Sequence, residues 1–166
     1  MNLMQFRSSA APARPKWQFI MTTFIGSFLC ISCLEWLTLM QHQLWIMAPF
    51  GATCVLAFAL PESPLAQPRH IIGGHFITAF IALMVLQFFG NGLWQIAFAV
   101  ATGIIAMQIL RVTHPPAGAN PLVILMTNTP WSFLIQPVLA GSICIVLIAW
   151  ISHCFISKRT YPVYWW

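Results

Sequence analysis

The five residues Pro49-Phe50-Gly51-Ala52-Thr53 return later in the chain as Pro116-Ala117-Gly118-Ala119-Asn120. In each copy an apolar run and a proline follow, and then the pair Gln-Pro, at 67–68 and at 136–137. Several separate features therefore recur in the same order, which indicates an internal repeat. The alternative is a chance match in a sequence that is rich in Pro and Ala.

Each copy of the repeat predicts the start of a short helix. Proline is favoured in the first helical turn, where its missing N–H loses no hydrogen bond. A helix from Pro49 to Leu60 measures roughly 18 Å, whereas the hydrocarbon core of a bilayer is about 30 Å thick. We therefore expect two half-helices, preceded by extended segments at 43–48 and 111–114. The alternative is that Pro and Gly only kink two complete helices that pack closely.

The composition around these repeats is that of a membrane protein. Of the 166 residues, 60% are hydrophobic and 5% are charged, whereas soluble domains carry about 25% charged residues. This excludes a soluble catalytic domain and a module that binds nucleic acid. The five cysteines lie in or beside apolar runs, with no second CxxC pair or histidine cluster near them. We therefore expect no metal site and no other cofactor.

The number of membrane crossings depends on the two short segments. Longer apolar runs, each of a length that spans a bilayer, lie at 17–40, 70–90, 93–112 and 132–152. If the short segments also cross, the six crossings place every Lys and Arg on one side, as the positive-inside rule requires. Four crossings would separate Arg69 from the N-terminal bases. We expect six crossings in the inner (plasma) membrane of a bacterium, with both termini cytoplasmic.

These crossings predict the organisation of the whole chain. Cytoplasmic tails at 1–16 and 154–166 flank a membrane domain at 17–153, which divides into repeats at 17–90 and 93–153. Because each repeat holds three crossings, the second is inverted relative to the first. The predicted fold class is an all-α polytopic membrane protein of two inverted three-helix repeats, each with a short half-helix broken by Pro and Gly.

The half-helices also suggest a binding site. The N-terminus of a helix exposes free N–H groups and a partial positive charge, and two such ends arriving from opposite sides would bind a small anion. Gly51 and Gly118 should then face each other across a polar cavity. Thr53 and Asn120 occupy the same repeat position, and both can hydrogen-bond an oxyanion; local capping of the backbone is the alternative.

Ionisable side chains near the half-helices extend this candidate site. His75 follows Gly73-Gly74, where another backbone can approach, and it can donate to an anion, relay a proton or only cap a carbonyl. Arg111 and His114 precede the second half-helix and add positive charge there; the alternative for Arg111 is that it extends to the interface. The candidate substrate-binding residues are Gly51, Ala52, Thr53, His75, Arg111, His114, Ala117, Gly118, Ala119 and Asn120.

The sequence resembles a known family at the second repeat. The run Thr113-His114-Pro115-Pro116-Ala117-Gly118-Ala119 is similar to the motif of the HPP family of integral membrane proteins, named for its His-Pro-Pro triplet. Residues 48–52, 63–69 and 72–75 resemble the family's other shared segment, and the similarity extends from about Trp17 to Ser152. Members in chloroplasts and cyanobacteria are known as nitrite transporters, so the resemblance implies transport of nitrite or a similar anion. The family is usually described with four membrane helices, fewer than the six crossings expected here.

The expected function is therefore a transporter or channel for a small inorganic anion, with nitrite first. The expected partners are that anion, the lipid bilayer and further copies of the chain, because a chain of this size is small to enclose a pathway alone. We do not expect an enzyme, since the sequence has no Gly-rich phosphate loop, HExxH motif or nucleophile elbow. The alternatives are an intramembrane enzyme with His75 or His114 as base, and a membrane sensor or structural protein.

Overall fold

The computed structural model describes residues 12–165, and the regular secondary structure within that range is entirely helical. The six α-helices are α1 (Trp17–Gln41), α2 (Ala48–Cys54), α3 (Pro68–Phe89), α4 (Leu93–Ile109), α5 (Asn120–Thr127) and α6 (Ala140–Ile151). Short 3-10 turns lie at Pro64–Ala66 and Pro115–Ala119, and π-helical segments at Val55–Ala59, Leu134–Leu139 and Ser152–Ser157. The π-helical segments extend α2 to Ala59 and α6 in both directions. Residues 1–11 of the predicted N-terminal tail lie outside the described range.

Three of the described helices are long and apolar enough to cross a membrane, at Trp17–Gln41, Pro68–Phe89 and Leu134–Ser157. They correspond to three of the long runs in the sequence. The run at 93–112 gives a shorter helix than expected, because α4 ends at Ile109 and spans only 17 residues. Arg111 has a left-handed backbone (φ 57°), which stops the helix there. The membrane-spanning, all-helical character is confirmed, but α4 is shorter than the predicted span.

The first predicted half-helix is present. The helix Ala48–Ala59 starts with Pro49 in its first turn, after Met47 in an extended conformation (φ −147°, ψ 151°). The second begins differently from the prediction, with the 3-10 turn Pro115–Ala119 in place of an α-helical turn. Pro115 and Pro116 have no N–H to donate, so the first bond of this turn runs from the Ala117 N–H to the His114 carbonyl at 3.0 Å. The α-helix follows from Asn120.

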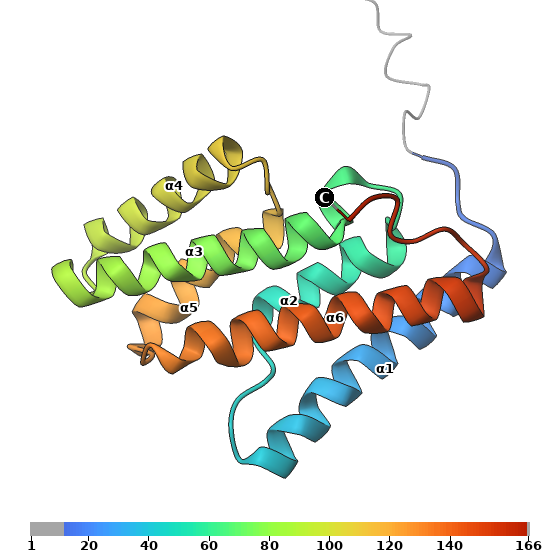
Figure 1. The fold of residues 1–166 in the computed structure, drawn as a ribbon, viewed down its shortest axis with the longest axis horizontal. Coiled ribbons are helices and arrows are strands. Elements are labelled where there is room, and N and C mark those ends of the chain that lie inside the picture. The colour runs from blue at the N-terminus through green and yellow to red at the C-terminus, as the bar shows by residue number, and fades with distance from the viewer. Residues whose placement is uncertain (1–11, 166) are drawn as a thin grey trace, which may run out of the picture.

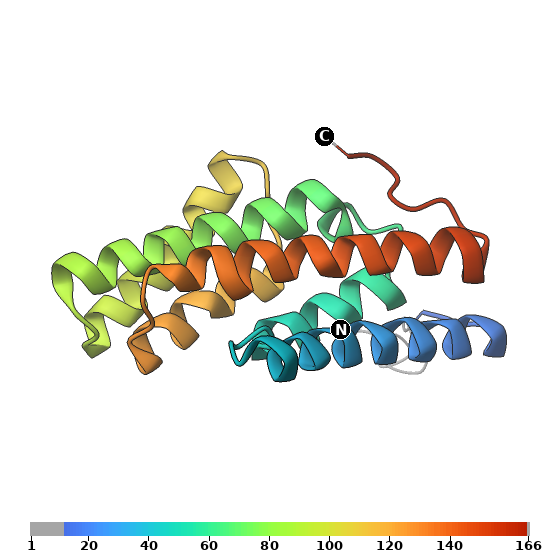
Figure 2. The same cartoon turned by 60° about the horizontal axis from the view of Figure 1, so that its bottom comes forward.

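The short helices lie among the long ones and point to opposite ends of the molecule (Figure 1). Both begin near its middle; α2 runs toward the end that carries the 60–67 loop, and α5 runs toward the end that carries the 128–133 turn. The long helices α3 and α6 lie side by side in both views (Figure 2), and they are in contact. The middle of the molecule therefore holds two helix starts between two complete helices.

Charge separates the two ends of the molecule. The start of α1, the 60–67 loop and the chain after Ser157 share one end (Figure 1), with Lys16, Arg69 and Arg159. The Arg69 guanidinium there donates to the carbonyl oxygens of Leu110 and Arg111, at 3.1 and 3.2 Å. The turns at 90–92 and 128–133, at the other end, contain no charged residue. Which end faces the cytoplasm stays a prediction.

Two glycines let the halves approach each other. A Cβ built on Gly74 of α3 would lie 2.7 Å from the Cβ of His114 and 2.9 Å from the carbonyl oxygen of Val112. A Cβ on Gly141 of α6 would collide with the ring of Phe50. The last long helix of each half, α3 or α6, thus contacts the other half's short helix or the segment before it. These contacts position the candidate site.

Candidate functional site

Four polar side chains from four segments meet where the short helices begin. They are Thr53 on α2, His75 on α3, His114 before the 3-10 turn, and Asn120 at the start of α5, and each is fully buried with 0% exposure. We call these four residues the histidine cluster. Burial of polar groups is unfavourable unless they are hydrogen-bonded, so their partners decide what the cluster can do.

The Thr53 hydroxyl lies at the centre of the cluster. Its oxygen is 2.8 Å from Nε2 of His75 and 3.0 Å from Nε2 of His114. The carbonyl oxygen of Pro49 lies 3.1 Å away, within the same helix. The centroids of the two imidazole rings are 5.1 Å apart. One hydroxyl therefore bridges two histidines that come from different halves of the chain.

The Nδ1 atoms of both imidazole rings also have hydrogen-bond partners. Nδ1 of His114 lies 2.8 Å from the carbonyl oxygen of Leu65. Nδ1 of His75 lies 3.1 Å from Nδ2 of Asn120 and 3.3 Å from its Oδ1. Nδ2 of Asn120 donates to the His75 carbonyl and to the Thr78 hydroxyl, both at 3.0 Å. Each ring nitrogen of the cluster thus has a partner.

The surroundings of the cluster are otherwise apolar or neutral. The ring of Phe50 meets His75 edge-on, with centroids 5.2 Å apart. The Thr78 hydroxyl donates to the Gly74 carbonyl at 2.8 Å. Within residues 12–165 no group of three or more His, Cys, Asp or Glu side chains is placed to hold a metal ion. The four side chains of the cluster offer hydrogen-bond donors and acceptors, and an imidazole is a group that can bind a proton.

The two repeat segments meet, but not across the polar cavity expected from the sequence. A groove of about 480 Å³ separates α2 from the 3-10 turn. Its lining is apolar, so the expectation of a polar cavity is wrong: the polar side chains lie buried behind it. The lining residues are Ala48, Pro49, Ala52, Leu56, Pro115, Pro116 and Ala119.

Neither repeat glycine is among the residues that line this groove. Gly51 is exposed and Gly118 is partly buried. A Cβ built on either would meet nothing within 4 Å. Side chains introduced at these positions would therefore project into free space without disturbing the core.

The structure brings some of the candidate site residues together and leaves others apart. Arg111 is exposed at the end of α4, and its carbonyl is held by Arg69. The N–H groups of Ala117 and Asn120 donate to the His114 and Ala117 carbonyls. These two N–H groups are used by hydrogen bonds within the turn. The sequence predicted that they would be free to bind an anion, and they are not.

Two members of the hydrogen-bond network were missed in the sequence. Thr78 follows His75 by three residues on the same helix, and this spacing puts both on one face, so it could have been found. The Leu65 carbonyl carries no sequence signal, because any residue supplies a carbonyl. Its position depends on how the 60–67 loop packs against His114.

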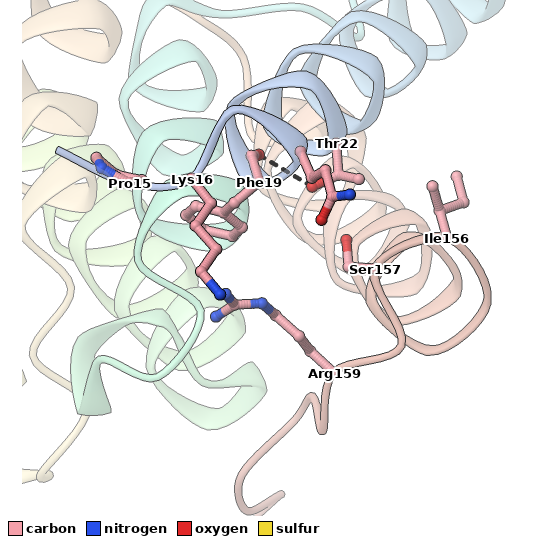
Figure 3. Close-up of a pocket in the computed structure, with 8 residues that line it drawn as sticks. Pro15, Lys16, Phe19, Thr22, Ile156, Ser157 and Arg159 are labelled. Carbon is pink, nitrogen blue, oxygen red and sulfur yellow. Dashed lines mark hydrogen bonds between the residues drawn. The ribbon is translucent and has the colours of Figure 1, made fainter.

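A second, larger cavity lies at the charged end, and no residue of the histidine cluster lines it; Figure 3 shows its lining. It measures about 670 Å³ and lies between the start of α1 and the end of the last helix. The guanidinium of Arg159 lies 4.2 Å from the centroid of the Phe19 ring and 3.2 Å from the carboxylate of Glu62. Its lining comprises Pro15, Lys16, Gln18, Phe19, Thr22, Ile156, Ser157 and Arg159.

Comparisons with known proteins match the sequence of this chain to one family. The family model described as HPP, transmembrane region, matches residues 12–162. Two transmembrane proteins of Dictyostelium discoideum are each 33% identical to the chain, one over 167 residues and the other over 168. The matches cover 93% and 94% of this chain, but only 59% and 54% of the relatives, so the chain spans little more than half of their length. No solved structure gives a significant match.

Proposed function

The chain belongs to the HPP transmembrane family, and on that premise we propose that this integral membrane protein transports a small inorganic anion, with nitrite as the first candidate. Nitrite enters the proposal through the family's chloroplast and cyanobacterial members, which are known as nitrite transporters. The observation that carries it is that two incomplete helices begin beside each other in the middle of the molecule, next to the buried histidine cluster.

Incomplete helices and buried ionisable groups are unusual inside a membrane. A backbone that leaves its helix at membrane depth is tolerated where protein surrounds it or where it lines a pathway. Ionisable residues there are costly and mark functional sites in most membrane proteins. The helix starts add partial positive charge, which favours an anion over a cation.

We propose further that the repeats 17–90 and 93–153 form an inverted pair. In support, each contains two longer helices around one short helix, and the short helices point to opposite ends (Figure 1). The contacts at Gly74 and Gly141 are also reciprocal, since each joins a long helix of one half to the other half's short helix or its preceding segment.

The groove between α2 and the 3-10 turn is the proposed pathway. It is open along one side of the single chain, where its lining residues Ala52 and Pro115 are exposed. An anion passing along it needs shielding from lipid, and we propose that a second copy of the chain supplies the missing wall. The transporter is then a homo-oligomer, with both termini of each copy on the cytoplasmic side.

Uptake by sealed proteoliposomes tests this function. The purified protein is reconstituted, and the initial rates of uptake of nitrite, nitrate, formate and chloride are compared with those of empty vesicles. We expect saturable nitrite uptake. The variant Gly118→Leu should remain folded, because a Cβ there meets nothing within 4 Å, and it should lose uptake, because it adds bulk next to Ala119 of the groove. Ala101→Leu, on the exposed face of α4, is the matched control and should transport normally.

The same vesicles separate the other functions. Chemical conversion of a supplied anion without its accumulation would indicate an intramembrane enzyme. Saturable binding with neither flux nor conversion would indicate a sensor. Either result, or no uptake of any of the four anions by the folded protein, would overturn the proposal.

A further inference from the structure

The hydrogen bonds of the histidine cluster determine where its protons lie. The Thr53 hydroxyl has a single proton to donate, but three acceptor positions surround it: Nε2 of His75, Nε2 of His114 and the Pro49 carbonyl oxygen. A hydroxyl oxygen can also accept two hydrogen bonds. The partners on the outer side of each ring decide which atom receives the Thr53 proton.

His114 is fixed by the Leu65 carbonyl. A carbonyl oxygen can only accept, so Nδ1 of His114 carries a proton and donates it at 2.8 Å. In a neutral imidazole the other nitrogen then has a lone pair. Nε2 of His114 is therefore an acceptor, and the Thr53 hydroxyl donates to it across 3.0 Å.

His75 is consequently fixed in the opposite tautomer. With the Thr53 proton used, Nε2–H of His75 donates to the Thr53 oxygen at 2.8 Å. Its Nδ1 then faces Nδ2 of Asn120 at 3.1 Å, and the two protons of this amide are shared among that nitrogen, the His75 carbonyl oxygen and the Thr78 hydroxyl oxygen. The Asn120 amide is oriented by the His75 carbonyl and the Thr78 hydroxyl, whose own proton goes to Gly74. The chain of donors runs in one direction, from Asn120 through His75 and Thr53 to His114 and Leu65.

This chain has room for one additional proton. If Nε2 of His114 becomes protonated, it donates to the Thr53 oxygen, and the Thr53 hydroxyl turns to the Pro49 carbonyl, which is already 3.1 Å away. The Thr53 oxygen then accepts from both rings and donates once, so no hydrogen bond is lost and no heavy atom needs to move. A second proton would have to enter at Nδ1 of His75, which already receives the Asn120 N–H.

The nearby groups do not neutralise the added charge. Within the described residues, α3 contributes His75 and, one turn earlier, His70, whose Nδ1 lies 2.8 Å from the Thr113 carbonyl. From α2 and α5 come Thr53 and Asn120, which are uncharged. Glu62, on the 60–67 loop, is exposed and paired with Arg159. A proton on His114 therefore makes a buried positive charge, which an anion beside it would stabilise.

We propose that the histidine cluster is a binding site for one proton, held on Nε2 of His114 with Thr53 as the rotating acceptor, and that this proton travels with the transported anion. The coupling rests on the proposed function: each ligand strengthens the binding of the other, and one proton and one monovalent anion move together without net charge. The proton site itself rests only on the hydrogen bonds of the cluster.

Nitrogen NMR of histidine-labelled protein in nanodiscs tests the proton site without any substrate. At neutral pH we expect the proton on Nδ1 in His114 and on Nε2 in His75. On acidification His114 should take up one proton before His75. In Thr53→Ser both features should remain. In Thr53→Val, which keeps the side-chain shape, His114 should keep its Nδ1 proton through the Leu65 carbonyl, whereas the His75 tautomer should no longer be fixed. Neutral His114 protonated on Nε2, or first uptake at His75, would overturn the proposal.

Proton movement during uptake tests the coupling. In weakly buffered proteoliposomes we expect one proton to enter with each nitrite for the wild type and Thr53→Ser. The uptake rate of Thr53→Val should be at most about one tenth of the wild-type rate, since two buried ring nitrogens lose their hydrogen-bond partner. Nitrite uptake without proton entry would overturn the coupling but leave anion transport intact. If no anion is taken up at all, the proposed function and the coupling both fail, and the NMR result still decides the proton site.

Discussion

The two halves of the molecule contribute unequal chemistry to one site. The first half supplies Thr53 on its short helix and His75 on its last helix, and the second supplies His114 before its short turn and Asn120 at the start of α5. The position that matches His114 in the first half is Met47. Counted from the shared Gln-Pro pair, the position that matches His75 in the second half is Cys144. The two proposed repeats thus share the sequence at their short-helix starts, whereas each histidine of the cluster occurs in one half only.

The largest effect should come from the glycine where a backbone approaches. In Gly74→Leu the side chain would collide with the Val112 carbonyl and with His114. We expect it to destabilise the protein by about 3 kcal/mol or more, because a packed backbone cannot relieve the overlap by changing a side-chain rotamer. At Gly141 the neighbour is a side chain, the ring of Phe50. Gly141→Leu should therefore lower the thermal midpoint less than Gly74→Leu, measured in the same detergent. Equal losses would show that the two contacts are equally rigid.

The histidines of the two halves should differ in their effect on pH dependence. Because the proton is carried with the anion, wild-type nitrite uptake should rise as the external pH falls. His114→Gln removes the proton's position, so uptake should fall about tenfold and lose this dependence. His75→Gln should reduce uptake but keep the acid stimulation. His153→Gln is a control outside the cluster, since Nε2 of His153 faces the Ala57 carbonyl at 2.8 Å. Acid stimulation that persists in His114→Gln but disappears in His75→Gln would reverse our assignment.

The smallest effect should come from the ion pair that joins the C-terminal tail to the first half at the surface. Arg159, in the C-terminal tail that follows the second half, lies 3.2 Å from the Glu62 carboxylate of the first half, and both are exposed. Solvent and salt screen such a pair, so Glu62→Gln should change the free energy of unfolding by less than about 1 kcal/mol. Uptake should be unchanged. A large loss of uptake would instead place the charged end, with its 670 Å³ cavity, on the transport pathway.

The positions of the half-helices could be predicted because they follow from local rules. Pro49 in a first helical turn and extended residues before it are properties of a few neighbouring residues, and the structure has both. The 3-10 start of the second half-helix was not expected, although the reason is local as well: two successive prolines remove two donors. The early end of α4 comes from the left-handed Arg111.

The composition of the site was harder to predict, because it depends on packing between distant segments. Thr53 and His114 are 61 residues apart, and their hydrogen bond requires α2 to lie against the 3-10 turn. The sequence named Thr53, His75, His114 and Asn120 as candidates, but as separate ligands and not as one network. It also placed polar groups in the groove, whereas the structure buries them behind small apolar residues.

Nitrite uptake by the two glycine variants tests the central claim most directly. Gly51 and Gly118 each precede a residue that lines the groove, Ala52 and Ala119, and a Cβ added at either glycine meets nothing within 4 Å. The initial uptake rates of Gly51→Leu and Gly118→Leu are measured in sealed proteoliposomes beside wild type and Ala101→Leu, with thermal stability recorded for each. We predict that both glycine variants are as stable as wild type and that both lose uptake. If both are folded and transport nitrite at the wild-type rate, the anion does not pass between the half-helices.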